Sequence, residues 1–179
     1  MDFSILYAIQ GIHNPALDSF ILAITKIMGS YGQIWLVVGA ALCLFKKTRR
    51  CGVAVLISYG LVYLVGQYGL KDLIARPRPC HIDQTVELLV KRPSSYSCPS
   101  THSAWAFAAA TSIFLYYRKA GIAVFAAAVL IGFSRLYLFV HFPTDVLFGA
   151  VMGAVLAYIT VKVQRVCMDK LTDRTAKQK

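Results

Sequence analysis

The chain has 179 residues, of which 58% are hydrophobic and only 15% are charged, and its formal net charge is +11. Because a soluble domain carries about 25% charged residues, this composition excludes an ordinary soluble domain, a disordered chain and a disulfide-dense secreted module. The length is that of one domain, so the sequence predicts a small integral membrane protein with a single all-α domain.

Residues 1–27 have the least regular hydropathy pattern. Two apolar stretches, residues 3–12 and 17–27, are each too short to cross a bilayer, which takes about 20 residues, and a polar segment ending at Pro15 separates them. We interpret them as two amphipathic helices in the membrane interface, and a sixth span built from this segment is the alternative. We expect no cleavable signal peptide, because a basic start and a small-residue cleavage site are absent.

Five longer apolar segments follow and predict a polytopic bundle of five transmembrane helices. Their ranges are 28–45, 51–70, 100–117, 120–140 and 142–161. Residues 162–179 are then expected to form a basic tail outside the bilayer.

The placement of lysine and arginine predicts the orientation of this bundle. Twelve of them fall at residues 46–50, 118–119 and 162–179, which alternate as one side of a five-span bundle, and six fall on the other side. Because basic loops stay in the cytoplasm, we expect a multi-pass cell-membrane protein with a cytoplasmic C-terminus. The net charge is thus a topology signal, and no nucleic-acid partner is expected.

Polar residues gather in three clusters at span ends, where an ionisable group is costly unless it is paired or functional. The clusters are residues 71–79, 99–102 and 134–145, and all three fall on the predicted non-cytoplasmic side. Their cations outnumber the acids Asp72 and Asp145, and an arginine fork and a helix N-terminus both suit phosphate. The predicted phosphate ligands are Lys71, Arg78, Ser100, Thr101 and Arg135.

Two histidines in these clusters supply reactive groups. His141 lies four residues before Asp145, and a carboxylate that holds one imidazole nitrogen leaves the other free to attack phosphorus. His102 lies in the first turn of a predicted span, where it can protonate the leaving oxygen. The pattern predicts covalent catalysis through a phosphohistidine that water later hydrolyses.

In order and spacing, the three clusters resemble the signature of the type 2 phosphatidic acid phosphatase superfamily, K-x6-RP, PSGH and SR-x5-H-x3-D. The matching residues are Lys71, Arg78, Pro79, Pro99, Ser100, His102, Ser134, Arg135, His141 and Asp145. The resemblance implies hydrolysis of a phosphomonoester or diphosphate without metal or cofactor, with His141 as nucleophile, Asp145 as its partner and His102 as general acid. The chain departs from the pattern at Thr101, where the family usually has glycine.

Three features outside the signature carry further expectations. Arg76 is interpreted as a solvated residue or a head-group contact. Gly149 and Gly153 form a G-x-x-x-G pair, which predicts close packing of the last span against a neighbouring helix. Cys80 and Cys98 bracket the external loop, so we expect a disulfide between them in an oxidising compartment. The five cysteines show no C-x-x-C spacing, so no zinc site is expected.

The expected site lies at the outer membrane surface, where a lipid phosphate can present its head group while its chains stay in the bilayer. Candidate substrates are undecaprenyl diphosphate, phosphatidic acid and phosphatidylglycerol phosphate, and the compact chain favours a prenyl diphosphate. Two alternatives stay open: a lipid phosphotransferase that uses the same site, and a non-catalytic lipid-phosphate binding or transport protein. The oligomeric state is not predicted.

Overall fold

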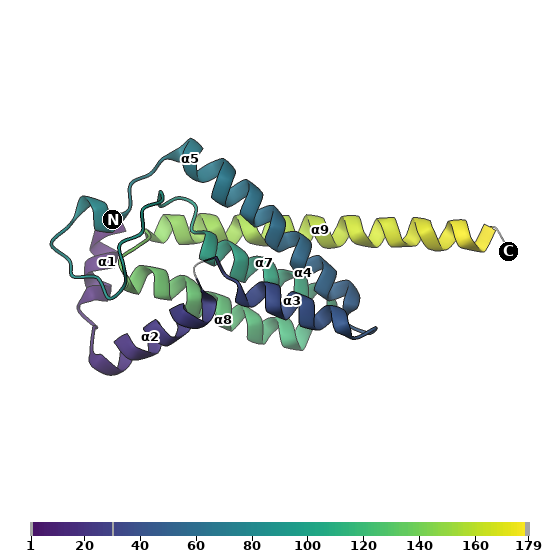
Figure 1. The fold of residues 1–179 in the computed structure, drawn as a ribbon, viewed down its shortest axis with the longest axis horizontal. Helices are drawn as coiled ribbons and strands as arrows, with labels where there is room; N and C mark the ends of the chain where they lie inside the picture. The colour runs from purple at the N-terminus through teal and green to yellow at the C-terminus, as the bar shows by residue number, and fades with distance from the viewer. Residues whose placement is uncertain (1, 30, 178–179) are drawn as a thin grey trace.

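The computed structural model describes residues 2–29 and 31–177, with side chains as far as Lys170. Every regular element in these residues is a helix, which confirms the all-α prediction (Figure 1). The elements are α1 (Asp2–Gln10), α2 (Pro15–Met28), α3 (Ile34–Leu44), α4 (Arg49–Val62), the π-helix η1 (Tyr63–Leu70), α5 (Lys71–Ile74), α6 (Pro79–Ile82), α7 (Thr101–Tyr116), α8 (Arg118–Tyr137) and α9 (Pro143–Lys177).

Three helical segments in the described residues are long and apolar enough to cross a membrane. They are Arg49–Ile82, Arg118–Tyr137 and Pro143–Lys170, and Ile34–Leu44 is a shorter apolar helix. The predicted span 100–117 corresponds to α7, which has 16 residues and is about 24 Å long. The structure thus shows a bundle of apolar helices, and the count of five spans stays a prediction.

Helix α7 lies at the centre of this bundle, where α3, α4, α8 and α9 surround it (Figure 1). Small side chains let the neighbouring backbones approach closely. A Cβ atom added at Gly149 would lie 2.3 Å from the carbonyl oxygen of Ser100, and one at Gly153 would lie 2.1 Å from that of Ala104. The close packing predicted from the G-x-x-x-G pair is therefore confirmed, with α7 as the neighbour of α9.

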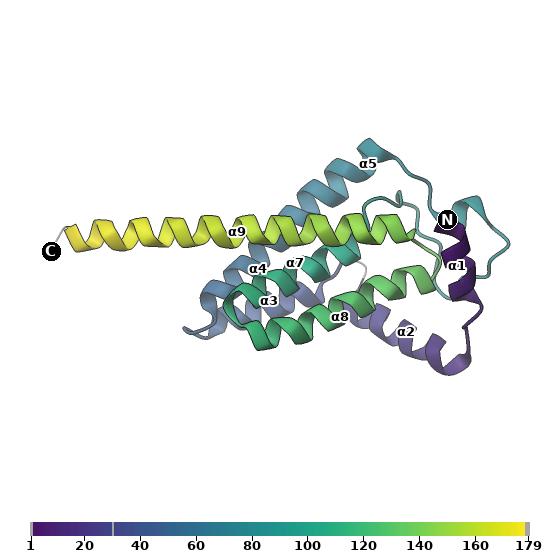
Figure 2. The same ribbon diagram turned by 180° about the vertical axis from the view of Figure 1, so that it is seen from behind.

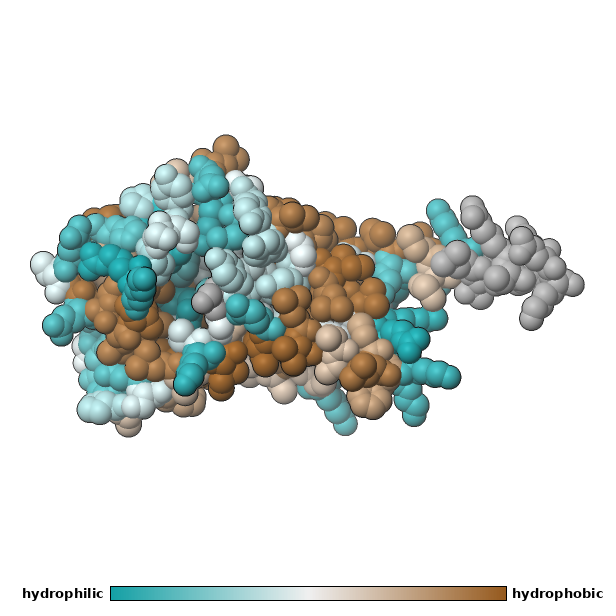
Figure 3. Space-filling view, in the orientation of Figure 1, coloured by the Kyte–Doolittle hydropathy of each residue, from teal (hydrophilic) through white to brown (hydrophobic). Residues whose placement is uncertain are grey.

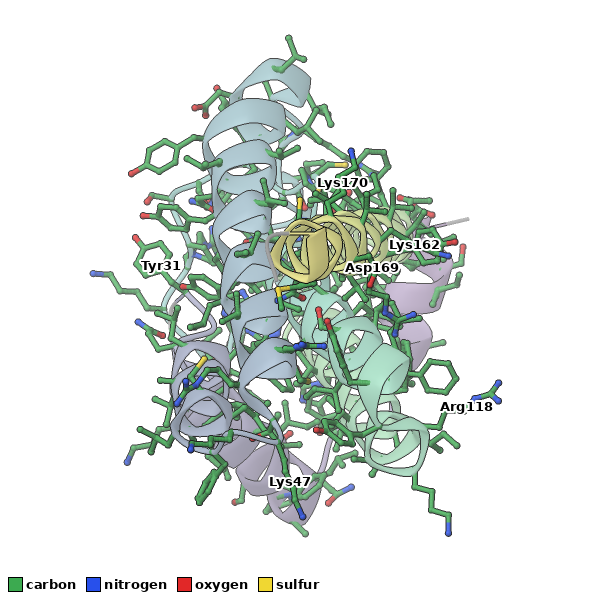
Figure 4. All side chains as sticks on the ribbon, turned by 90° about the vertical axis from the view of Figure 1, so that its right-hand side faces the viewer. Tyr31, Lys47, Arg118, Lys162, Asp169 and Lys170 are labelled. Carbon is green, nitrogen blue, oxygen red and sulfur yellow. The ribbon has the colours of Figure 1, made fainter. Side chains whose placement is uncertain are left out.

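The described parts of the three basic segments, which lie around residues 47, 118 and 165, come together at one end of the molecule. The Tyr117 hydroxyl donates to the carbonyl of Lys47 over 2.7 Å, and the Arg165 guanidinium donates to the carbonyl of Leu115 over 2.6 Å. Figure 4 views the molecule from the end at which α9 projects and shows the side chains of Lys47 and Arg118 pointing away from the bundle. On the face in Figure 3, hydrophobic residues gather between this end and the more hydrophilic end near α1 and α5.

The N-terminal segment forms two helices at the end of the bundle opposite to the basic loops (Figures 1 and 2). Asn14 caps α2, since its side chain accepts a hydrogen bond from the N–H of Leu17 over 3.0 Å, and Pro15 occupies the first turn, where its missing N–H costs nothing. Leu6 of α1 and Ile21 of α2 are fully buried, so both helices pack against the bundle. Their place in the membrane interface stays a prediction.

Helix α9 extends well beyond the other helices (Figure 2). The predicted span ends at residue 161, whereas the helix continues to Lys177. The described part of the expected basic tail is therefore helical and continuous with the last span.

Candidate active site

A cavity of about 540 Å³ opens at the end of the bundle opposite to the basic loops. Residues from α2, η1, α5, α7 and α8 and from the loops around residues 90–95 and 140–141 line it. Six of the predicted site residues are among them: Lys71, Arg78, Thr101, His102, Arg135 and His141. The three sequence clusters thus surround one cavity, and both histidines face it.

Breaks in the helical structure between α5 and α6 determine where Lys71 and Arg78 lie. Lys71 begins α5, and Ala75, the residue that follows this helix, is left-handed with φ of 48°. Pro77 interrupts the helix, and Pro79 favours an extended conformation of the residue before it. Arg78 is accordingly extended and precedes α6. The chain therefore turns sharply between Lys71 and Arg78, and both side chains point into the same cavity, where each is about 4% exposed.

Three hydrogen bonds fix the Arg78 guanidinium in the wall of the cavity. Its Nε donates to the carbonyl of Ser95 over 2.6 Å, its Nη2 donates to Ser95 Oγ over 3.0 Å, and its Nη1 donates to the carbonyl of Val140 over 2.8 Å. Lys71 Nζ lies 3.4 Å from the same Ser95 Oγ. Ser95, which the sequence analysis did not identify, thus joins the two cations.

The contact between Arg78 and His141 determines the tautomer of the histidine. Arg78 Nη1 lies 3.1 Å from His141 Nε2, and a guanidinium can only donate, so Nε2 holds a lone pair and Nδ1 carries the proton. Burial, followed by the charges of Arg78 and Lys71, lowers the pKa of His141 to about 3, against the opposing effect of Asp145. The imidazole is therefore neutral at physiological pH, with an unprotonated Nε2 at the cavity wall.

Asp145 lies behind His141, but the two side chains do not form a direct hydrogen bond. His141 Nδ1 is 3.8 Å from Asp145 Oδ2, which exceeds hydrogen-bond distance. The Ser97 hydroxyl lies beside both groups: it donates a hydrogen bond to Asp145 Oδ2 and lies 3.5 Å from His141 Nδ1. The backbone N–H of Phe142 also donates to Asp145 Oδ2, over 2.9 Å. Ser97 is a second residue that the sequence analysis missed.

Arg135 enters the cavity from the last turn of α8. Its Nη2 donates to Thr25 Oγ1 over 2.6 Å, and its Nε donates to Ser134 Oγ over 3.1 Å. Thr25 belongs to α2, so the N-terminal segment forms one wall of the cavity. The exposed side chains of Lys26 and Lys91 also line it, and they add two positive charges nearer to solvent than the buried cations.

His102 occupies the first turn of α7, on the wall next to α2. Its Nε2 is 3.1 Å from the carbonyl oxygen of Gly29, which can only accept, so Nε2 carries a proton. The other nitrogen, Nδ1, is then the one available for proton exchange.

Two predicted phosphate ligands differ in their surroundings. Thr101 lines the cavity, and its hydroxyl lies 3.4 Å from Gln67 Oε1 of η1. Ser100 is fully buried and absent from the described cavity lining: its hydroxyl pairs with Ser103 over 3.0 Å, and its N–H donates to the carbonyl of Asp145 over 3.1 Å. The structure thus places Ser100 as a support for the start of α9 and does not bring its side chain to the cavity.

The structure differs from the interpretation of Arg76 as a solvated residue or a head-group contact. Its guanidinium forms ion pairs with Asp2 at 3.0 Å and with Asp145 at 2.7 Å. The Arg76 side chain is 32% exposed and so partly solvated. The sequence-based interpretation missed its ion pairs because both acids come from segments about 70 residues away in sequence.

The predicted disulfide is a second correction, since all five cysteines lie in the described residues and are free. Cys80 is enclosed in a cluster with Leu6, Phe139 and Phe142. Cys98 lies near Asp145 instead, and burial is the main cause that raises its pKa to about 11. Both thiols are buried and unbonded in the structure, although they bracket the same loop.

The chemistry of the cavity suits an anion. Three buried cations, Lys71, Arg78 and Arg135, line it, and paired arginine donors match phosphate oxygens. In the described residues, no group of three or more histidine, cysteine, aspartate or glutamate side chains is arranged to hold a metal ion.

Comparison with known proteins gives consistent matches. The sequence model of the PAP2 superfamily matches residues 51–169. The chain is 31% identical to an undecaprenyl-diphosphatase of Sulfolobus acidocaldarius over 140 residues, which cover 76% of this chain and 68% of that protein. It is also 31% identical to undecaprenyl-diphosphatase BcrC of Bacillus subtilis over 163 residues, which cover 89% and 82%. The crystal structure of a transmembrane PAP2 type phosphatidylglycerolphosphate phosphatase from Bacillus subtilis matches with a TM-score of 0.75 and 30% identity, covering 92% of this chain and 84% of that one.

Proposed function

The chain belongs to the PAP2 superfamily, and we propose that it is a membrane lipid phosphatase that works through a phosphohistidine on His141. The observation that carries the mechanism is the position of His141 Nε2. This nitrogen holds its lone pair in a cavity lined by three buried cations, and it lies 3.1 Å from Nη1 of one of them, Arg78.

The buried cations support the binding step. A phosphate group in the cavity meets Lys71, Arg78 and Arg135, which neutralise its charge and fix its oxygens. When phosphate oxygens accept the Nη1 donor of Arg78, the lone pair of His141 Nε2 is released. Substrate binding therefore exposes the nucleophile that Arg78 otherwise occupies.

The two chemical steps then follow from the positions of the histidines. His141 Nε2 forms a bond to phosphorus, the bond from phosphorus to the leaving oxygen breaks, and that oxygen takes a proton from protonated His102. Water then attacks the phosphohistidine, His102 accepts a proton from it, and the P–N bond breaks to release inorganic phosphate. The chain of Ser97 and Asp145 behind Nδ1 stabilises the positive charge that develops on the imidazole.

The proposed orientation puts this cavity on the extracytoplasmic side of the cell membrane and the C-terminus in the cytoplasm. The basic loops support it, because they gather at the end opposite to the cavity and basic loops stay in the cytoplasm. Reaction of a membrane-impermeant thiol reagent with Cys167 of α9 only after the membrane is permeabilised would agree with this orientation. Labelling of Cys167 in intact cells would contradict it.

A lipid diphosphate is the proposed substrate class, with undecaprenyl diphosphate ahead of a phosphatidic-acid-like lipid. The relatives named undecaprenyl-diphosphatase support this choice. The charge distribution supports it too, because Lys26 and Lys91 at the open side of the cavity provide cations for a second phosphate beyond the buried three.

Phosphate release by the full-length protein in detergent tests the function. The substrates are undecaprenyl diphosphate, undecaprenyl phosphate, phosphatidic acid and phosphatidylglycerol phosphate, each with and without a metal chelator. We expect release that the chelator does not reduce. His141→Ala should lower the rate by at least about 10³-fold, whereas His81→Ala is the matched control, since His81 is absent from the described cavity lining.

Trapping of the intermediate tests the mechanism itself. Labelled phosphate from the substrate should be found on the protein in an acid-labile, base-stable form, and His141→Ala should lack it. Normal turnover by His141→Ala would contradict the assignment of the nucleophile. Label recovered on a lipid acceptor in place of inorganic phosphate would indicate a phosphotransferase.

A further inference from the structure

Arg76 forms a network that the phosphatase signature does not include. Its Nη1 donates to Asp145 Oδ1 over 2.7 Å and to Thr144 Oγ1 over 2.7 Å, and its Nη2 donates to Asp2 Oδ2 over 3.0 Å. The guanidinium also lies over the ring of Phe142, 4.1 Å from the ring centroid. Nη1 of Arg76 thus contacts two residues of α9, and Nη2 contacts one residue of α1.

The two oxygens of the Asp145 carboxylate have separate roles in this network. Oδ1 accepts from Arg76, while Oδ2 accepts from Ser97 and from the N–H of Phe142. The Asp145 side chain is fully buried, and a buried carboxylate needs a compensating charge. His141 is neutral when its Nδ1 faces this group, so Arg76 supplies the positive charge that Asp145 contacts directly.

Arg76 also positions Ser97 through its backbone. The carbonyl of Arg76 accepts a hydrogen bond from the N–H of Ser97 over 2.8 Å. One residue therefore holds both groups behind His141: the side chain of Arg76 holds Asp145 and its carbonyl holds Ser97.

We propose that Arg76 is a positioning residue for the reaction, which turns the Asp145 carboxylate so that Oδ2 faces Ser97 and His141. Asp2 of α1 in turn fixes Arg76, so the N-terminal helix supports the catalytic centre from 143 residues away. Arg76 is absent from the described residues that line the cavity, and it therefore acts through Asp145 without touching the phosphate. This inference rests on the proposed function.

The test measures kcat and KM for phosphate release from undecaprenyl diphosphate by full-length variants in detergent. We expect Arg76→Ala to lower kcat by roughly 30-fold with KM changed less than about 3-fold, because a hydrogen bond to a charged group corresponds to about 10–100-fold in rate. Arg76→Lys keeps the charge but replaces the forked guanidinium with a single ammonium group, and should recover part of the loss. Asp2→Asn should lower kcat by about 3-fold, and Arg92→Ala, an exposed arginine of the external loop, should leave it unchanged.

A double-mutant cycle separates positioning from general damage to the fold. If Arg76 acts through Asp145, then Arg76→Ala costs less than about 3-fold when Asp145→Asn is already present, because interacting residues are not additive. An equal loss in both backgrounds would overturn the proposal, and so would an effect on KM alone, which would make Arg76 a phosphate ligand. If Arg76→Ala does not fold, Arg76→Lys and Asp2→Asn decide by the same criteria.

Failure of the inference and failure of the proposed function give different results. A wild-type protein that releases phosphate, together with an inactive His141→Ala and a fully active Arg76→Ala, would overturn the role of Arg76 alone. A wild-type protein inactive on every lipid phosphate would overturn the proposed function and, with it, the inference.

Discussion

The Ser97 hydroxyl lies between the Asp145 carboxylate and the imidazole of His141, the proposed nucleophile. Ser97 Oγ donates to Asp145 Oδ2 and lies 3.5 Å from His141 Nδ1, whereas Asp145 Oδ2 itself lies 3.8 Å from that nitrogen. The substitution Ser97→Ala therefore removes the link and leaves a separation wider than a hydrogen bond.

The expected size of the effect follows from the lost interaction. A hydrogen bond to a charged group contributes about 1.5–3 kcal/mol, and about 1.4 kcal/mol corresponds to a tenfold change in rate. We expect kcat for Ser97→Ala to fall by roughly 10- to 100-fold. KM should change by less than about 3-fold, since Ser97 is fully buried and absent from the described cavity lining.

A single-turnover measurement of phosphohistidine formation, quenched in base, places the loss at the first chemical step. Ser19→Ala is the matched control, because the Ser19 hydroxyl is exposed and bonds only to the backbone of its own helix among its described contacts. A Ser97→Ala variant that forms the phosphohistidine within about twofold of the wild-type rate would refute the role of this hydroxyl.

Three further predictions test packing, pH dependence and substrate choice. A methyl group at Gly153 would lie 2.1 Å from the carbonyl oxygen of Ala104, so Gly153→Ala should lower the free energy of unfolding by about 1–3 kcal/mol, measured as a lower melting temperature in detergent. Burial lowers the pKa of His141 from 6.5 to about 3, so the unfolded chain binds a proton more readily between these values and stability falls as pH drops below about 6.5. Thermal melts should show a loss of about 2 kcal/mol at pH 5 that His141→Gln lacks. The double variant Lys26→Ala/Lys91→Ala should raise KM about 3–10-fold for a lipid diphosphate, and an equal rise for a monophosphate would contradict a second phosphate site.

The sequence predicts the residues around the cavity because they are charged or titratable and lie at the ends of apolar segments, where such residues are rare. A buried lysine or arginine is costly beside hydrocarbon, so Lys71, Arg78 and Arg135 stand out in a chain with 15% charged residues. Their spacing relative to the two histidines then indicates one site, and the structure gathers these five side chains around one cavity.

The residues behind the cavity lack such a signal. Ser95 and Ser97 belong to a loop with several serines, and nothing in the sequence distinguishes the two that contact Arg78 and Asp145. Thr25 contacts Arg135 from 110 residues away. Arg76 was predicted to be solvated for the same reason, since its partners are distant in sequence and only the folded bundle brings them close.

The span count shows a different limit of sequence reasoning. Apolar length predicts five spans, yet α7 has only 16 residues, and its alanines pack against protein on several sides. A hydropathy pattern records that a residue avoids water but does not distinguish lipid from neighbouring helices. The boundaries of such a central helix therefore depend on packing as well as on bilayer thickness.

The close packing of α7 against α9 connects this bundle to its chemistry. The N–H of Ser100 donates to the carbonyl of Asp145 over 3.1 Å, so the start of α7 holds the residue behind His141, the proposed nucleophile. One turn later, Gly149 lets α9 approach the backbone of Ser100, where a Cβ atom would lie 2.3 Å from its carbonyl oxygen. A side chain at this glycine would have to move the first turn of α9 and so shift Asp145 relative to His141. The same small residue that allows the helices to pack therefore also sets the relative positions of His141 and Asp145, the proposed catalytic pair.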